Sequence, residues 1–112
     1  MIGGLLLPIL LSAVLIWAGG LNLAGPSFIR AEFAGWGYSD GLRIAVGLTE
    51  WVAAIALTFA RFRIVGCILA MLALLGVIVT LIRHRSLMRL EYPLVLLALT
   101  LMVAAQTFGL ID

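Results

Sequence analysis

The chain has 112 residues, of which 65% are hydrophobic and 11% are charged, and its mean hydropathy is +1.29. Soluble proteins carry charge on roughly a quarter of their residues, so this composition indicates a membrane protein. The net charge of +2 rests on seven arginines and no lysine, which is too sparse for a nucleic-acid surface. Since one membrane span needs about 20 residues, four spans would use nearly the whole length, and we expect a single all-α membrane domain over residues 1–112.

The first span is predicted over residues 2–24, because no charged side chain occurs before Arg30. A cleaved signal peptide is the alternative. Against it, a basic N-terminal region is missing and the apolar stretch is too long. Gly25 and Pro26 predict the end of the helix, because proline disfavours helical geometry in the residue before it.

Residues 25–40 form the one predicted connection that is long enough to be more than a turn. Ser27 is positioned to cap a short helix that carries Arg30 and Glu32. Aromatic side chains gather at headgroup level in membrane proteins, and this segment supplies four of them: Phe28, Phe33, Trp36 and Tyr38. We therefore expect an interfacial segment folded over one mouth of a helix bundle.

Three further apolar stretches predict spans at about residues 41–60, 62–82 and 93–111. Arg61 and Arg63 leave only a tight turn between the second and third spans. Pro93 suits the first turn of the fourth span, where its missing N–H would be unpaired in any case. The predicted fold is a polytopic membrane protein, a four-transmembrane-helix antiparallel bundle with the interfacial segment between its first two helices.

Glu50 stands near the middle of the otherwise almost wholly apolar stretch 41–60. A charged side chain at the centre of a bilayer costs roughly 3 kcal/mol or more, so such residues usually face a bundle interior or cavity and mark function. At helical spacing, the face of Glu50 also carries Arg43, Val46, Gly47, Ala53, Ala54 and Leu57. The opposite face carries Leu48, Val52, Ile55 and Phe59. Small residues favour close helix packing, so we expect the Glu50 face to point inward.

The third span has a comparable stripe of Gly66, Ala70, Ala73, Val77, Thr80 and His84. Its simplest interpretation is helix packing. The Gly66, Ala70 and Ala73 part of the stripe suits either packing within the bundle or a homodimer.

The expected topology brings five of the seven arginines to one membrane side, and leaves Arg61 and Arg63 on the other. By the positive-inside rule, the crowded side is cytoplasmic and both termini are outside. The expected location is the plasma (inner) membrane, with multiple passes.

The same topology predicts a pocket with Glu50 deep inside, Asn22 about a turn inside the mouth and His84 at the rim, with Thr49 and Thr80 as further polar candidates. Arg43 lies two helical turns from Glu50, or roughly 10 Å, so it can pair with the carboxyl only if its long side chain reaches down. Without a cationic partner, desolvation favours the protonated carboxyl. Two interpretations stay open. Glu50 recognises a ligand, or it hydrogen-bonds Asn22, Thr49 or a backbone carbonyl and only fixes helix pairing.

Several short motifs along the chain point to a protein family. They are Gly-Leu-Asn-Leu-Ala-Gly-Pro at 20–26, Phe33, Gly-Trp-Gly-Tyr-Ser at 35–39, Gly-Leu-Thr-Glu-Trp at 47–51 and Gly-Cys-Ile-Leu-Ala-Met at 66–71. Together they resemble the DoxX-like family of small four-helix membrane proteins. The family glutamate matches Glu50. Asn22 stands where the family has a lysine and Ser39 where it has a proline, so a lysine–glutamate pair is absent here.

Members of that family are similar to subunits of quinone-linked oxidoreductases, to parts of membrane redox-defence complexes and to a chaperone that assembles acetylcholine receptors. The resemblance implies a non-catalytic accessory or assembly protein that holds a quinone, a lipid or a partner transmembrane helix in a groove near Glu50. The alternatives are a quinone-positioning subunit in which Glu50 exchanges a proton, and a proton-coupled exporter. Small multidrug exporters carry their essential glutamate in the first span, where this chain has no charge.

The sequence also limits the available chemistry. Cys67 is the single cysteine, which excludes an internal disulfide and a Cys-x-x-Cys relay. His84 is the single histidine, so paired haem ligands are missing, and no metal-ligand spacing occurs. We therefore assign no catalytic residue, no metal and no cofactor, with a quinone as candidate ligand. The expected partners are membrane lipid, another membrane protein and a second copy of the chain.

Overall fold

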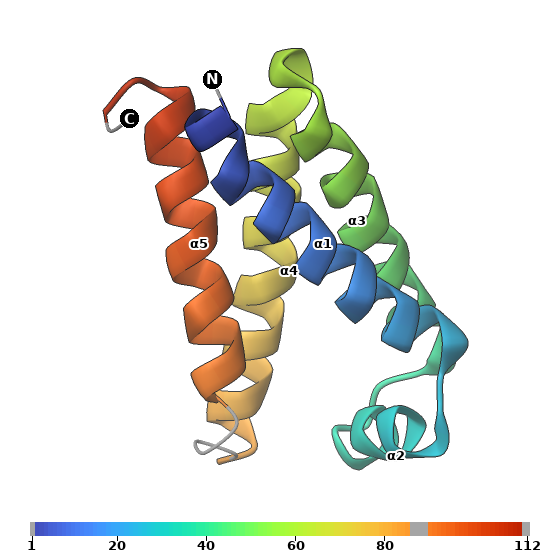
Figure 1. Cartoon of the computed structure of the whole chain (residues 1–112). Helices are drawn as coiled ribbons and strands as arrows, with labels where there is room; N and C mark the ends of the chain where they lie inside the picture. Colours follow the sequence, from blue (N-terminus) through green and yellow to red (C-terminus); the bar gives the residue numbers. More distant parts are fainter. Residues whose placement is uncertain (1, 86–89, 111–112) are drawn as a thin grey trace.

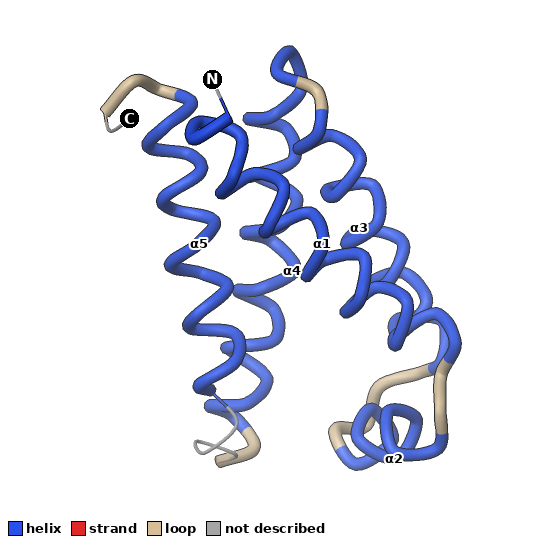
Figure 2. Tube along the Cα trace, in the orientation of Figure 1, coloured by secondary structure: helices blue, strands red, loops and turns tan. Residues whose placement is uncertain are grey.

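The computed structural model describes residues 2–85 and 90–110, and this part of the chain is helical, without strands. Figure 2 shows helices joined by short loops. The α-helices are α1 (Ile2–Ala24), α2 (Ser27–Gly35), α3 (Asp40–Thr58), α4 (Arg63–Arg83) and α5 (Glu91–Thr107), and a 3₁₀ turn, Ala60–Phe62, joins α3 to α4. The prediction of an all-α membrane protein is confirmed.

Within residues 2–85 and 90–110, three helical segments are long and apolar enough to cross a membrane: Gly4–Ala24, Asp40–Thr58 and Ala60–Arg83. The fourth predicted span, 93–111, corresponds to α5, an apolar helix of 17 residues. It begins earlier than predicted and ends at Thr107, and Gly109 follows with a left-handed φ of 77°. At 1.5 Å per residue α5 is about 26 Å long, slightly less than the roughly 30 Å hydrocarbon core. A membrane crossing by α5 is therefore taken up below as a proposal.

Successive long helices run in opposite directions (Figure 1). The start of α1 and the end of α5 lie at one end of the molecule, while α2, the end of α4 and the start of α5 lie at the other. Helix α1 is close to α5 near its own N-terminus and diverges from it toward α2.

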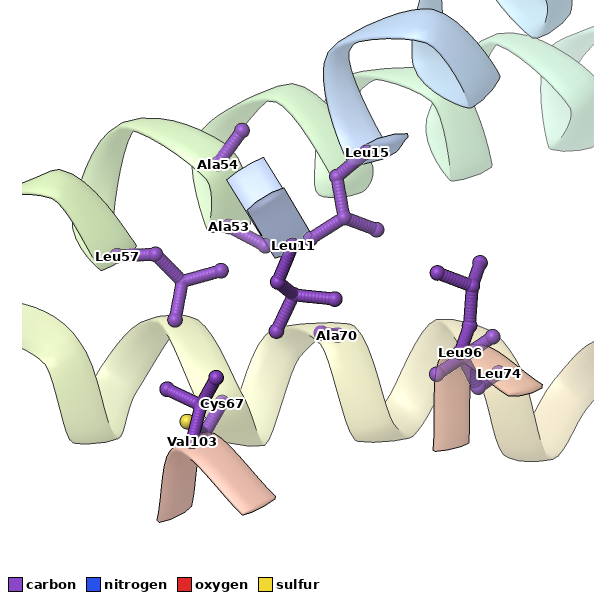
Figure 3. Packing of buried hydrophobic residues seen from close by; sticks show 10 residues of the cluster. All are labelled: Leu11, Leu15, Ala53, Ala54, Leu57, Cys67, Ala70, Leu74, Leu96 and Val103. Atoms are coloured by element: carbon purple, nitrogen blue, oxygen red, sulfur yellow. The ribbon is translucent and has the colours of Figure 1, made fainter. Parts of the chain in front are cut away.

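A core of mainly aliphatic side chains joins α1, α3, α4 and α5 at their middle (Figure 3). Leu11 of α1 points toward Ala70 of α4, and Val103 of α5 lies beside Cys67. The fully or nearly fully buried members of this core are Leu11, Leu15, Ala53, Ala54, Leu57, Cys67, Ala70, Leu74, Leu96 and Val103. Cys67 is thus a buried thiol packed within this core.

The predicted inward face of α3 is confirmed. Its buried residues are Arg43, Gly47, Glu50, Ala53, Ala54 and Leu57. The opposite face is exposed at Leu48, Val52, Ile55 and Phe59. Since the molecule is a membrane protein, this outer face is the one that contacts lipid.

Two glycines set the distance between α1 and α3. A Cβ added to Gly47 would lie 3.0 Å from the carbonyl oxygen of Gly19, and one added to Gly19 would lie 2.9 Å from the carbonyl oxygen of Gly47. Such spacing leaves no room for a side chain, because a backbone atom cannot move aside as a flexible side chain can. The two backbones therefore meet directly, as small residues allow in membrane helices.

The small residues Gly66 and Ala70 of α4 pack against α3 in the same way. A Cβ on Gly66 would lie 2.9 Å from the carbonyl oxygen of Ala53 and 2.9 Å from the amide nitrogen of Leu57. Gly66 and Ala70 are buried inside the single chain. A homodimer would therefore need a surface other than the Gly66, Ala70 and Ala73 stripe.

The start of α2 differs from the prediction. Ser27 is the first helical residue, and Pro26 occupies the cap position without a side-chain hydrogen bond. The carbonyl of Pro26 instead accepts hydrogen bonds from the amides of Ile29 and Arg30. The prediction of a Ser27 cap was wrong, because Gly25, with a φ of 62°, ends α1 abruptly and Pro26 starts the next helix at once.

Candidate functional site

Glu50 meets Asn22 inside the bundle. The Asn22 side-chain amide donates a hydrogen bond of 2.6 Å to Oε1 of Glu50, whose residue is only 7% exposed. The contact follows from the glycine packing, since a Cβ on Gly47 would lie 3.1 Å from the Cβ of Asn22. The structure thus brings together the first two residues of the predicted site.

Arg43 does not reach Glu50. Its guanidinium donates to the backbone carbonyl of Asn22 and, at 3.5 Å, to that of Leu23, while its Nε lies 3.3 Å from Asp40. The last carbonyls of a helix lack partners within the helix and carry partial negative charge, so a buried cation stabilises them. Arg43 therefore closes the C-terminus of α1, a role that the sequence analysis missed.

A pocket of about 720 Å³ lies beside Glu50. It occupies the α2 end of the molecule, where α1 and α5 diverge (Figure 1), and residues from all five α-helices form its walls. Most of these residues are apolar or aromatic: Trp17, Ala18, Leu21, Phe28, Ile29, Phe33, Trp36, Val46, Val77, Leu81, Pro93 and Val95. Trp17 and Val95 are largely exposed, so the pocket is open toward the lipid-facing surface.

The polar lining of the pocket is acidic. Asn22 and Glu50 form one part of the wall, Glu32 of α2 a second part, and Glu91 and Tyr92 of α5 a third. No arginine or histidine occurs among the described residues that line it. Glu32, Glu91 and Tyr92 are site residues that the sequence analysis did not select, because their distance from Glu50 depends on how α2 and α5 fold over α3.

Three predicted site residues lie elsewhere. Thr49 donates to the carbonyl of Ala45 within its own helix, at 2.8 Å. His84 is exposed at the C-terminal cap of α4. Thr80 is buried but lines a second pocket of about 500 Å³. None of the three lines the pocket beside Glu50, so their predicted roles have no support from its geometry.

The aromatic residues of the interfacial segment form a cluster. The ring of Phe33 lies 5.3 Å from that of Trp36 and 6.4 Å from that of Tyr38, and Phe33 is buried. Phe28 alone of the four predicted interfacial aromatics is exposed. Since Phe33 and Trp36 line both pockets, the cluster separates one from the other.

A hydrogen bond joins the cluster to α4. The hydroxyls of Tyr38 and Thr80 lie 2.9 Å apart, and Thr80 donates its own proton to the carbonyl of Gly76 at 2.8 Å. Tyr38 is therefore the donor in the pair. This bond holds the end of the α2 segment against the bundle.

Tyr38→Phe is expected to loosen α2 without changing the core. Loss of a hydrogen bond worth about 1 kcal/mol should raise amide exchange in residues 27–35 roughly fivefold. Hydrogen–deuterium exchange followed by mass spectrometry measures this. Phe28→Leu, a change at an exposed ring of the same helix, serves as control and should leave the exchange unchanged. Equal exchange in Tyr38→Phe and the native chain would show that the bond does not hold α2.

The sequence analysis also did not predict two hydrogen bonds between α1 and α3. The indole N–H of Trp51 donates to the carbonyl of Ile16 at 3.0 Å, and the hydroxyl of Ser12 donates to that of Ala54 at 3.0 Å. Polar groups in a bilayer usually find partners within the protein, which is the only sequence signal for these bonds. Together with the Asn22–Glu50 bond they join α1 to α3 along most of their length.

Comparison with known proteins gives one match. The model of a family described as DoxX-like matches residues 6–103. No curated protein and no solved structure matches the chain.

Proposed function

The chain belongs to the DoxX-like family, and from this premise we propose that it is a non-catalytic accessory or assembly protein of the membrane. In this proposal it holds a hydrophobic ligand, a quinone or a lipid, in the pocket beside Glu50. A partner transmembrane helix is the other occupant that the same open groove admits. The observation that carries the proposal is a nine-tenths buried carboxyl in the wall of an otherwise mainly apolar pocket.

The size and position of the pocket support ligand binding. Sites for small molecules usually measure about 300–1,000 Å³, have mostly apolar walls and contain a few polar groups that fix orientation. The volume of about 720 Å³ falls within that range, and Glu50, Asn22 and Tyr92 are such polar groups. A molecule dissolved in the bilayer could enter between Trp17 and Val95 without crossing a polar surface.

The proposed membrane arrangement follows from the helix directions. In it, α5 is the fourth span, and local bilayer thinning accommodates its slightly short length at modest cost. The end with α2 faces the cytoplasm, and the end with Arg61 and Arg63 faces outward. The plasma membrane is the proposed location.

A quinone-positioning subunit is the second candidate, and the polar lining favours it. A quinone carbonyl needs a hydrogen-bond donor, and both the Tyr92 hydroxyl and a protonated Glu50 can supply one. In this version Glu50 would take or give the quinone's proton while a partner protein carries the electrons.

Photo-crosslinking tests whether the pocket is the binding site. Diazirine-bearing phospholipid and diazirine-bearing quinone are incorporated separately into liposomes with the protein, and adducts are located by peptide mass spectrometry. The proposal predicts adducts concentrated on Trp17, Tyr92 and Val95, reduced by excess unlabelled ligand. Adducts spread evenly over the outer face, at Val52, Ile55 and Ile68 as much as at the pocket, would contradict it. The head group of the crosslinked probe separates the quinone from the lipid version.

A further inference from the structure

We infer that the ligand held beside Glu50 is a lipophilic cation, a molecule with an apolar body and a positively charged head. The inference rests on the proposed function, since it requires that the pocket holds a hydrophobic ligand, and it favours a positively charged ligand over the neutral quinone. Three features of the pocket carry it: an incompletely satisfied buried carboxyl, an acidic polar lining and aromatic rings on several walls.

The carboxyl of Glu50 has capacity for another hydrogen bond. Asn22 donates to Oε1, and Oε2 accepts no hydrogen bond from the described residues. A carboxylate accepts hydrogen bonds at both of its oxygens, so Oε2 keeps the capacity to accept one. Because Glu50 forms part of the pocket wall, a ligand with a donor or a positive charge can complete its interactions.

The rest of the polar lining has the same sign. Glu32 and Glu91 add two carboxyl groups to the wall, and the described lining contains no basic side chain. Charges act more strongly on each other in a low-dielectric site than in water. A cationic head would be attracted to the carboxyl groups of Glu50 and Glu91 in this wall, and an anionic head would be repelled by them.

Aromatic residues in the pocket wall are the third feature. Trp17 comes from α1, Phe28, Phe33 and Trp36 from α2, and Tyr92 from α5, so rings border the pocket on several sides. The face of an aromatic ring attracts a cation, and tryptophan does so most strongly. An acidic pocket with several aromatic rings is the usual complement of an organic cation. Such a head could belong to a lipid amine or to a free lipophilic cation, which share this chemistry.

A pair of ions of matched size tests the charge. Tetraphenylphosphonium and tetraphenylborate have the same shape and opposite charge. Binding of each to the full chain in non-ionic detergent is measured by equilibrium dialysis. The inference predicts that the phosphonium binds with about one equivalent per chain and the borate at least about tenfold more weakly, the difference expected from one close charge contact.

Substitutions in the pocket test whether the phosphonium binds beside Glu50. Glu50→Gln should weaken phosphonium binding at least about tenfold, as loss of a charge contact requires. Asp40→Asn removes a carboxylate from the same helix outside the pocket and should leave binding unchanged. Should Glu50→Gln fail to fold, Trp17→Leu gives a second test. Its ring is largely exposed, so folding is not at risk, and loss of a cation–π contact should weaken binding about two- to fivefold.

The outcomes separate this inference from the proposed function. Equal binding of the two ions, or equal phosphonium binding in Glu50→Gln and Asp40→Asn, overturns the inference. The proposed function then still stands if the crosslinking probes label the pocket, and falls with the inference if they do not. The source of the cation follows from nanodiscs of phosphatidylglycerol with and without phosphatidylethanolamine. Phosphonium binding weakened by the ethanolamine lipid supports the inference with a lipid amine as ligand, and unchanged binding supports it with a free cation.

Discussion

Gly47→Leu is expected to separate α1 from α3 and to destabilise the protein by about 3 kcal/mol, the upper end of the usual cost of overpacking. The first carbon of the new side chain would lie 2.8 Å from the Cγ of Leu23 and 3.0 Å from the carbonyl oxygen of Gly19. Leu23 can change its rotamer, but the Gly19 backbone cannot yield unless α1 moves. Unfolding in increasing mole fractions of dodecyl sulfate, followed by tryptophan fluorescence, measures the loss.

Gly20→Leu is the matched control, because a Cβ there would have no atom within 4 Å. It should leave the unfolding midpoint close to that of the native chain. Because the Asn22–Glu50 bond depends on the same helix contact, Gly47→Leu should also reduce ligand content. If the two variants unfold alike, α1 and α3 do not meet through their glycines.

Asn22→Leu is expected to lower mainly the stability of the protein, and Glu50→Gln mainly its affinity for the ligand. The glutamine side chain in Glu50→Gln would keep an oxygen that accepts from Asn22, so the helix contact should survive. Asn22→Leu instead leaves the buried carboxyl without its donor, at a cost of about 1–3 kcal/mol. We expect Asn22→Leu to lower the unfolding free energy more than Glu50→Gln does, and Glu50→Gln to lose at least about tenfold in ligand affinity.

This comparison separates the two interpretations that the sequence left open. If Glu50 only locks the helices, both variants should retain ligand in proportion to the folded protein. If Glu50 recognises the ligand, Glu50→Gln stays folded and binds poorly. Thermal unfolding measures the stability of each variant, and ligand titration on the same preparations measures its affinity. A stable Glu50→Gln protein with native affinity would rule out a role for Glu50 in recognition.

The inward face of α3 was predictable because it depends on local periodicity alone. Ala53 and Leu57 lie one helical turn apart on the buried face, and Ile55 and Phe59 lie one turn apart on the exposed face. The end of α1 was predictable for a similar reason, since Gly25 and Pro26 stop a helix regardless of its surroundings.

The contents of the site were less predictable, because they depend on how helices pack. The Asn22–Glu50 bond requires the direct backbone contact at Gly19 and Gly47, and no periodicity in either helix specifies that register. Arg43 was expected near the pocket mouth, but its long side chain turns to the end of α1. Thr80 shares a helix face with pocket residues, yet it is hydrogen-bonded to Tyr38 and lines the second pocket instead.

The central claim is that the pocket beside Glu50 is occupied by a ligand in the membrane. The most direct measurement is native mass spectrometry of the protein extracted gently with its own lipids, comparing the native chain with Val46→Trp and Val52→Trp. Val46 lines the pocket, whereas Val52 lies on the exposed outer face of the same helix. The account predicts a bound molecule in the native chain and in Val52→Trp, and its loss in Val46→Trp, where the larger indole side chain fills the pocket. Retention of that molecule by a folded Val46→Trp protein would contradict it.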